Sequence, residues 1–374
     1  MKISIISIAF IMICNGGSSA AFAQETSRFP SNTAMEFTGT VAGQPVLVEL
    51  METENGLNGR YKYLKIGAII SLEGVIDPQH HNAIELAEGK QAGSKPRPTW
   101  RAVYRNDSII GKWYSGDRTR THAIALSKKV VEKLPVSFKK LKRDTVVYSN
   151  PKDTTLPAFT YHNSILQAEG NKELSQWLNA ELMKIYPSYK SSNAIEKNIS
   201  KDMKDHILVY IESVADAGYP ENVSWNWDYE NAQYENYHGQ GYLTIYTSGY
   251  EFSGGAHGNS WEVYENYDIR NKKKLPLSAV IHIDSTKISA LLEKKFREDY
   301  EVEEGKSLTE FGLFENKIKP NNNFYFDDWG MTFVYNQYEI GPYALGIIAL
   351  FIPWEKLQPY LDHTFSRRMG LIYK

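Results

Sequence analysis

A succession of short strand-like runs separated by turn residues occupies residues 37–126. Turn pairs such as Asn58-Gly59 lie where hairpins would reverse, and Tyr61 and Tyr63 alternate with lysine, as half-buried strands require. No stretch of this region keeps the 3.6-residue period of a helix. The pattern therefore predicts a small all-β domain over residues 30–130, an antiparallel barrel or sandwich.

The rest of the chain combines helices with strands. Apolar stripes at helical spacing cover residues 171–186 and 194–217, which defines a helical part over 157–220. Strand-like alternation dominates the sheet-rich part, residues 221–374. Helices followed by sheet-dominated sequence predict an α+β domain over 157–374, so the fold class expected for the whole chain is α+β.

Residues 131–156 separate these two predicted domains. The segment contains prolines and the basic cluster KKLKRD, and strand character is evident only at Thr145–Tyr148. We expect a connection that carries one short strand.

The first 23 residues have the character of a secretory signal peptide. One lysine precedes an apolar run, and Ala21-Phe22-Ala23 provides the small residues of a cleavage site. Cys14, the only cysteine, lies inside this segment after Ile13, which is a poor match to a lipoprotein signal. We expect cleavage near Ala23, export to the periplasm or the extracellular space, and no membrane span in the mature chain, since no later apolar run is long enough.

The charge balance gives little indication of a charged partner. Lys+Arg total 42 and Asp+Glu total 44, so no strong field would attract nucleic acid, and we expect no nucleic-acid partner. Tyrosine is abundant, with 25 residues. Such aromatic side chains either fill β-cores or form amphipathic contact surfaces.

The stretch YEFSGGAHGNSWEVYENYDI, residues 250–269, contains a histidine between glycines. His257 could be a general base, because imidazole titrates near neutral pH. In a structural interpretation, Gly254, Gly255 and Gly258 adopt backbone angles closed to other residues, and His257 donates a buried hydrogen bond that locks the turn. We prefer the structural interpretation, because no serine, cysteine or acid is an obvious partner.

Other constellations do not point to a particular chemistry. No metal-ligand spacing occurs, so we predict no metal site, and no phosphate loop or dinucleotide motif suggests a cofactor. Paired carboxylates such as Asp327-Asp328 suit a turn between two strands. Whether two acids meet in a cleft, as a glycosidase requires, is left open by sequence adjacency.

Several motifs taken together carry a resemblance to a known family. They are YEFSGGAHGN at 250–259, the aromatic strand to Asp268, NFYF at 323–326, YEIGPYA at 338–344, and IPW at 352–354 with Leu357, Tyr360 and Leu361. In this order they resemble the C-terminal domain of the lysozyme-binding anti-sigma factor RsiV, over residues 155–374 and best from 240 onward. A similar domain of unknown function occurs in some secreted polysaccharide deacetylases.

The resemblance implies an extracytoplasmic domain that presents a surface to a protein partner, which for RsiV is lysozyme bound across its substrate cleft. The sequence has neither a sigma-binding segment nor a deacetylase domain that we identify, so those activities do not transfer. The N-terminal β domain has no counterpart in RsiV that we identify.

These observations favour an exported, non-enzymatic binding protein that recognises a lysozyme-like muramidase or another envelope protein. The expected contact residues are Tyr338, Pro342 and Tyr343, because proline stiffens a loop flanked by aromatic side chains. Alternatively, these residues only shape a connection between strands. The rival hypothesis is a cell-envelope hydrolase or glycan-binding protein that uses His257 with a carboxylate, and a third is a glycan or protein bound by the β domain.

Overall fold

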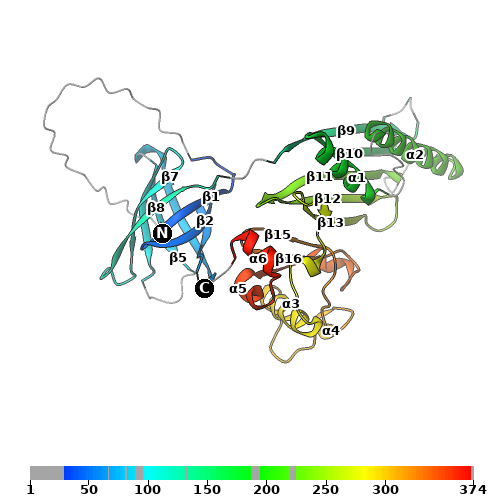
Figure 1. Cartoon of the computed structure of the whole chain (residues 1–374). Helices are drawn as coiled ribbons and strands as arrows, with labels where there is room; N and C mark the ends of the chain where they lie inside the picture. The colour runs from blue at the N-terminus through cyan, green and yellow to red at the C-terminus, as the bar shows by residue number, and fades with distance from the viewer. Residues whose placement is uncertain are drawn as a thin grey trace, which may run out of the picture. The chain divides into compact units, whose positions relative to one another are not determined.

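The computed structural model divides the chain into two compact units (Figure 1). It describes residues 29–371 except 66, 81, 90–95, 131–133, 151, 153, 156, 187–193 and 220–224. The first unit comprises residues 1–43, 49–59 and 71–128, and the second comprises 44–48, 60–70 and 129–374. The predicted signal peptide, residues 1–23, lies outside the described residues. Within the described ranges, no helix has both the length and the apolar character needed to span a membrane.

An eight-stranded antiparallel barrel forms the N-terminal part, as predicted. Its strands are β1 (Met35–Val41), β2 (Gln44–Thr53), β3 (Gly56–Tyr63), β4 (Ile69–Asp77), β5 (Ala83–Glu88), β6 (Thr99–Arg105), β7 (Ser108–Tyr114) and β8 (Thr121–Lys128), with a 3₁₀ turn at Pro78–His80. Pairing of β1 with β8 closes the barrel. Three aromatic rings are buried in the barrel. Phe29 stacks on Phe37, and Tyr104 packs edge to face against both.

A six-stranded sheet in the order β14-β13-β12-β11-β10-β9 forms one half of the second unit. Its strands are β9 (Val136–Tyr148), β10 (Ala158–Gly170), β11 (Trp227–Gly239), β12 (Tyr242–Phe252), β13 (Asn259–Asp268) and β14 (Lys273–Lys274). Among these described strands, β10 and β11 pair in parallel and the other neighbours pair antiparallel. A parallel pair requires a crossover, and the helices α1 (Lys172–Leu182) and α2 (Ile195–Asp216) provide it (Figure 1).

The helices cover one face of this sheet. Leu178 and Leu182 from α1 and Ile199 from α2 are buried in one cluster with sheet residues such as Ile165 and Ile245. The opposite face carries the even-numbered residues of β12 and stays partly open, because α1 and α2 pack on the odd-numbered ones.

Strand β9 is longer than the sequence indicated. We expected a strand only at Thr145–Tyr148, but pairing with β10 begins at Val136. The lysines and arginine of KKLKRD hid the alternation of the strand, because β9 is an edge strand whose basic side chains face solvent. The segment 131–156 thus contributes a full strand to the sheet.

A three-stranded antiparallel sheet, β15-β16-β17, builds the remainder of the second unit. The elements are β15 (Phe324–Phe326), β16 (Gly330–Tyr335), β17 (Ile348–Pro353), α3 (Ser285–Asp299), α4 (Leu308–Phe311), α5 (Trp354–Leu357) and α6 (His363–Met369), with 3₁₀ turns at Leu277–Ala279, Tyr343–Leu345 and Gln358–Tyr360. A further 3₁₀ turn, Met183–Ile185, follows α1 beside the six-stranded sheet. Phe296 of α3, Phe333 of β16 and Trp354 share its buried core.

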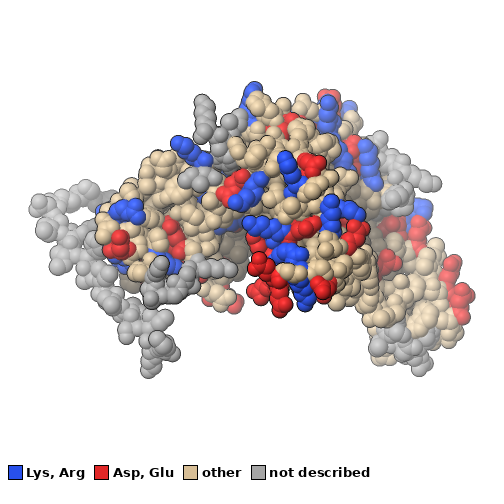
Figure 2. All heavy atoms as spheres, turned by 90° about the horizontal axis from the view of Figure 1, so that it is seen from below, with Lys and Arg blue, Asp and Glu red and all other residues tan. Residues whose placement is uncertain are grey.

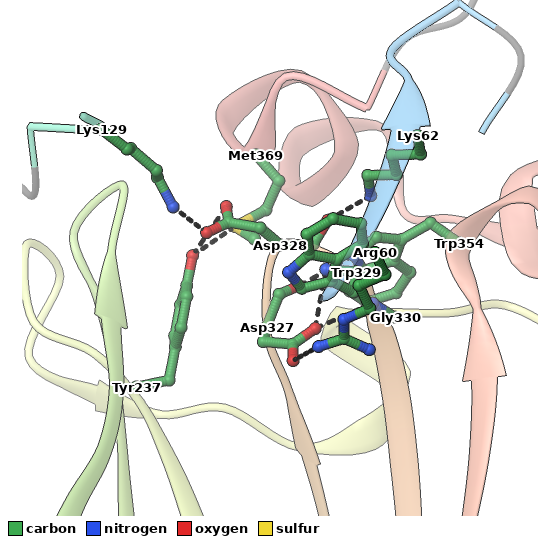
Figure 3. A network of polar contacts seen from close by, with 10 residues as sticks. All are labelled: Arg60, Lys62, Lys129, Tyr237, Asp327, Asp328, Trp329, Gly330, Trp354 and Met369. Carbon is green, nitrogen blue, oxygen red and sulfur yellow. Dashed lines mark hydrogen bonds and ion pairs between the residues drawn. The ribbon is translucent and has the colours of Figure 1, made fainter. Parts of the chain in front are cut away.

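The turn between β15 and β16 is the centre of a polar network (Figure 3). Asp327 Oδ1 accepts hydrogen bonds from the backbone amides of Trp329 at 2.7 Å and Gly330 at 3.0 Å, which confirms the predicted turn. Asp327 Oδ2 lies 4.0 Å from the guanidinium of Arg60, which also stacks over the Trp329 ring.

Asp328 interacts with two lysines in the same network. Lys129 forms an ion pair with its carboxylate, and Lys62 donates to its backbone carbonyl (Figure 3). We expected Lys62 to face solvent opposite Tyr61 and Tyr63, but it is only 1% exposed. A buried ammonium is tolerated where an oxygen accepts a hydrogen bond from it, as the Asp328 carbonyl does from Lys62.

Candidate binding surface

The GGAHG loop connects β12 to β13. Gly254 and Gly255 both have φ of +98°, in the region that favours glycine, as the structural interpretation predicted. Gly258 differs, because it has no positive φ and is instead required by a close approach. A Cβ atom at Gly258 would overlap the ring of Tyr250.

His257 is exposed, which corrects the expectation of a buried hydrogen bond. Its Nδ1 donates to the carbonyl oxygen of Gly258 at 3.0 Å, and Nε2 then accepts from the hydroxyl of Tyr338 at 3.3 Å. The imidazole also stacks on Tyr343, with ring centroids 3.7 Å apart. The histidine therefore bonds to backbone as expected, but at the surface of the molecule.

The turn after β16 provides the two tyrosines. Tyr338 has φ of +65°, which is strained for a residue with a side chain, and its side chain is 52% exposed. Pro342 precedes the 3₁₀ turn Tyr343–Leu345 and is half-buried, as is Tyr343. The fold thus brings Tyr338 and Tyr343 to His257, which is at least 81 residues away from either tyrosine in the sequence. We name these three residues the loop cluster.

Side-chain amides hold this turn against β13. Asn336 Oδ1 accepts from the Glu262 amide at 2.7 Å, and Gln337 Oε1 accepts from the Ser260 amide at 3.0 Å. Asn323 Oδ1 accepts a hydrogen bond from the Tyr264 backbone amide at 2.8 Å. These amides pair an edge of β13 that has no neighbouring strand at these residues, so the loop cluster is held by directional bonds and its geometry is largely preorganised.

The loop cluster offers stacking and hydrogen bonding. Among the residues that the structure describes, no carboxylate forms a hydrogen bond or ion pair with His257. In the same part of the chain, no group of three or more histidine, cysteine, aspartate or glutamate side chains is placed to hold a metal ion. A general base needs an orienting partner and a reacting group. The hydrogen-bond partners of His257 in the described residues are the Gly258 carbonyl and the Tyr338 hydroxyl.

A second surface feature was not predicted. Four tyrosines from four strands stack face to face across the open face of the six-stranded sheet and onto β15: Tyr234, Tyr246, Tyr264 and Tyr325, with centroid separations of 5.8, 4.9 and 4.5 Å. We name them the tyrosine row. Lys140 Nζ lies 3.9 Å from the centroid of Tyr234 at one end. The signal was present as even-numbered tyrosines in β11, β12 and β13, but strand register was needed to align them.

Burial and a nearby carboxylate raise the pKa of two members of the tyrosine row. Burial raises the pKa of Tyr264 and Tyr246 above the usual range of tyrosine, and Glu262 adds to the effect. Both hydroxyls lie 3.1 Å from the Glu262 carboxylate and donate to it. Tyr246 and Tyr264 therefore stay protonated and neutral at physiological pH.

Comparison with known proteins supports the fold of the second unit. Residues 283–355 match the family model described as "Protein of unknown function (DUF3298)". The crystal structure of a member of that family from Bacteroides fragilis superposes with a TM-score of 0.55 at 22% identity, covering 64% of this chain and 98% of that one. A DUF3298 family protein from Pseudomonas aeruginosa gives a TM-score of 0.43 at 16% identity, over 61% of this chain and 96% of its own. No curated protein matches the sequence.

The matched segment places the candidate contact residues within a defined fold. It includes Tyr338, Pro342 and Tyr343 but not the GGAHG loop. At 22% identity the likeness concerns the fold alone. The resemblance to RsiV, and its lysozyme partner, stays a prediction.

Proposed function

We propose that this chain is an exported, non-enzymatic binding protein whose loop cluster contacts a protein partner. The observation that carries the proposal is the stacking of His257 on Tyr343 beneath an exposed Tyr338. Aromatic side chains held rigidly at a surface lose little entropy on binding and are common at the energetic centres of interfaces. A lysozyme-like muramidase is the most specific candidate partner, on the resemblance to RsiV.

The surface charges fit a partner chosen by shape more than by net charge. On the face drawn in Figure 2, acidic and basic side chains lie side by side without a field of one sign. Electrostatic steering would then contribute little, and affinity would depend on a few desolvated aromatic contacts.

Titration of residues 24–374 into hen egg-white lysozyme tests this proposal. We expect binding with a Kd of about 1 μM or tighter and a matching loss of muramidase activity on cell walls. Tyr338→Ala should weaken binding about 10-fold or more, which corresponds to about 1.4 kcal/mol. Tyr219→Ala is the control, because Tyr219 is also an exposed tyrosine with positive φ but lies just after α2 and is not part of the loop cluster. Absence of binding at micromolar concentrations would rule out lysozyme as the partner.

The rival hypothesis of a hydrolase keeps one supporting observation, the exposure of His257. Its test is incubation of the protein with purified cell walls and measurement of released reducing ends. Activity that His257→Ala abolishes would replace the binding proposal.

A further inference from the structure

A groove of about 550 Å³ lies on the open face of the six-stranded sheet. Its floor is one row of directly paired residues across five strands: Lys142, Ser164, Ala232, Ser248 and Glu262. The three central members are small, so the sheet is hollowed there, and the two long side chains stand at the ends.

Two parallel rows of larger side chains form the walls. On one side, Tyr234 lines the groove two residues along β11 from Ala232, and its cross-strand partner Tyr246 stacks against it. On the other side stands the paired row of His162, Glu230 and Tyr250. Each wall lies two residues, or about 6.6 Å, along the strands from the floor. Neighbouring strands are about 4.8 Å apart, so a floor that crosses five strands is about 19 Å long. The groove is therefore about one sugar ring wide and several rings long.

The tyrosine wall is preorganised. The rings of Tyr234, Tyr246 and Tyr264 stack on one another, and the ammonium of Lys140 lies over the outer face of the Tyr234 ring. Only ring edges and hydroxyl groups are then left for a ligand. Such a wall gives apolar contact and hydrogen bonds without moving on binding.

The charged residues that line the groove are two lysines, Lys140 and Lys142, and three acids, Asp144, Glu230 and Glu262, so cations are not in surplus. Asp144 and His162 pair at 3.0 Å on one rim, and Lys142 and Glu262 lie at opposite ends of the floor. Ser164 Oγ is buried in the groove floor without a hydrogen-bond partner among the described residues. A polyanion would require a surplus of cations here, whereas a ligand rich in hydroxyl groups can donate to the carboxylates and accept from the two lysines.

We propose that this groove binds a neutral oligosaccharide whose rings lie across the strands from Lys142 to Glu262. The groove contains no residue of the loop cluster, so this proposal goes beyond the proposed function. An extended peptide fits less well, because its side chains alternate to both sides of its backbone and need a wider channel or pockets in the floor.

The test is NMR titration of the isotopically labelled protein with four neutral tetrasaccharides: β-1,4-linked N-acetylglucosamine, cellotetraose, maltotetraose and mannotetraose. We expect saturable shifts for groove residues with at least one of them, at a Kd of about 1 mM or tighter. Ala232→Leu and Ser248→Leu fill the floor and should each weaken binding about 10-fold or more. A circular dichroism melt checks that both variants are folded.

Two controls separate this site from the loop cluster and from a peptide ligand. Tyr338→Ala should leave sugar binding unchanged, while Ala232→Leu should leave protein-partner binding unchanged. The proposal is overturned if none of the four sugars binds up to about 10 mM, or if folded Ala232→Leu and Ser248→Leu bind as wild type. A neutral tetrapeptide that binds more tightly than every sugar would also overturn it.

Discussion

Replacing Asp327 by asparagine should change how stability depends on pH. Burial raises the pKa of this carboxyl to about 6 from 3.8, although the amides of Trp329 and Gly330 and the charge of Arg60 oppose the shift. Both amides donate to the same oxygen, Oδ1, which an asparagine side chain retains. Asp327→Asn therefore preserves both hydrogen bonds of the turn, while it removes the titration and the negative charge that faces Arg60.

The sign follows from proton linkage. A carboxyl with a raised pKa binds its proton more tightly in the folded protein than in the unfolded chain, so its contribution to stability is present below pH 3.8. That contribution is lost as pH rises through about 6. The full shift of about two pKa units corresponds to about 3 kcal/mol. The side chain is 31% exposed, so solvent screening reduces the expected effect to about 1–2 kcal/mol.

Urea unfolding followed by tryptophan fluorescence measures this effect in wild type and variant. Comparison of the two proteins at each pH cancels the other titrating groups. Between about pH 4 and pH 7.5, the free energy of unfolding of wild type should fall by about 1–2 kcal/mol relative to Asp327→Asn. An equal difference at both pH values would refute the argument that burial dominates over the Arg60 charge and the two amides.

Three further substitutions test packing. Gly258→Ala should cost about 1–3 kcal/mol and lower the melting temperature, because the new methyl group meets the ring of Tyr250; a variant as stable as wild type would contradict this close approach. Tyr246→Leu should lower the free energy of unfolding by about 1–3 kcal/mol, because the Tyr246 ring stacks on both Tyr234 and Tyr264. Tyr234→Leu should cost about half as much, because it loses one tyrosine stack. Equal losses of stability in thermal melts would argue against the tyrosine row.

Local patterns predicted the elements of this fold better than their extent. Turn pairs and alternation gave the barrel, and apolar stripes gave α1 and α2. Strand β9 was underestimated because an edge strand tolerates consecutive basic residues, so its composition resembles a linker. Ile211, expected in the buried stripe of α2, is 47% exposed, because helical spacing alone does not say how far a sheet extends beneath a helix.

The candidate surfaces show the same limit at longer range. Spacing within 338–343 singled out the two tyrosines, and the glycines singled out the loop of His257, but their stacking depends on tertiary pairing. The burial of Lys62 likewise depends on a carbonyl 266 residues away. Features that need register between distant strands, such as the tyrosine row, have no local signature beyond the residue type.

Strand β13 explains why two different surfaces belong to one compact unit. Its first residues follow the GGAHG loop, Glu262 ends the groove floor, and Tyr264 belongs to the tyrosine row. Side-chain amides instead of a strand pair one edge of β13, which lets the turn with Tyr338 approach it closely. A substitution in β13 would disturb both surfaces at once. Tyr338→Ala and Ala232→Leu separate them because each changes a residue outside β13, so opposite effects on protein and sugar binding would identify two independent sites.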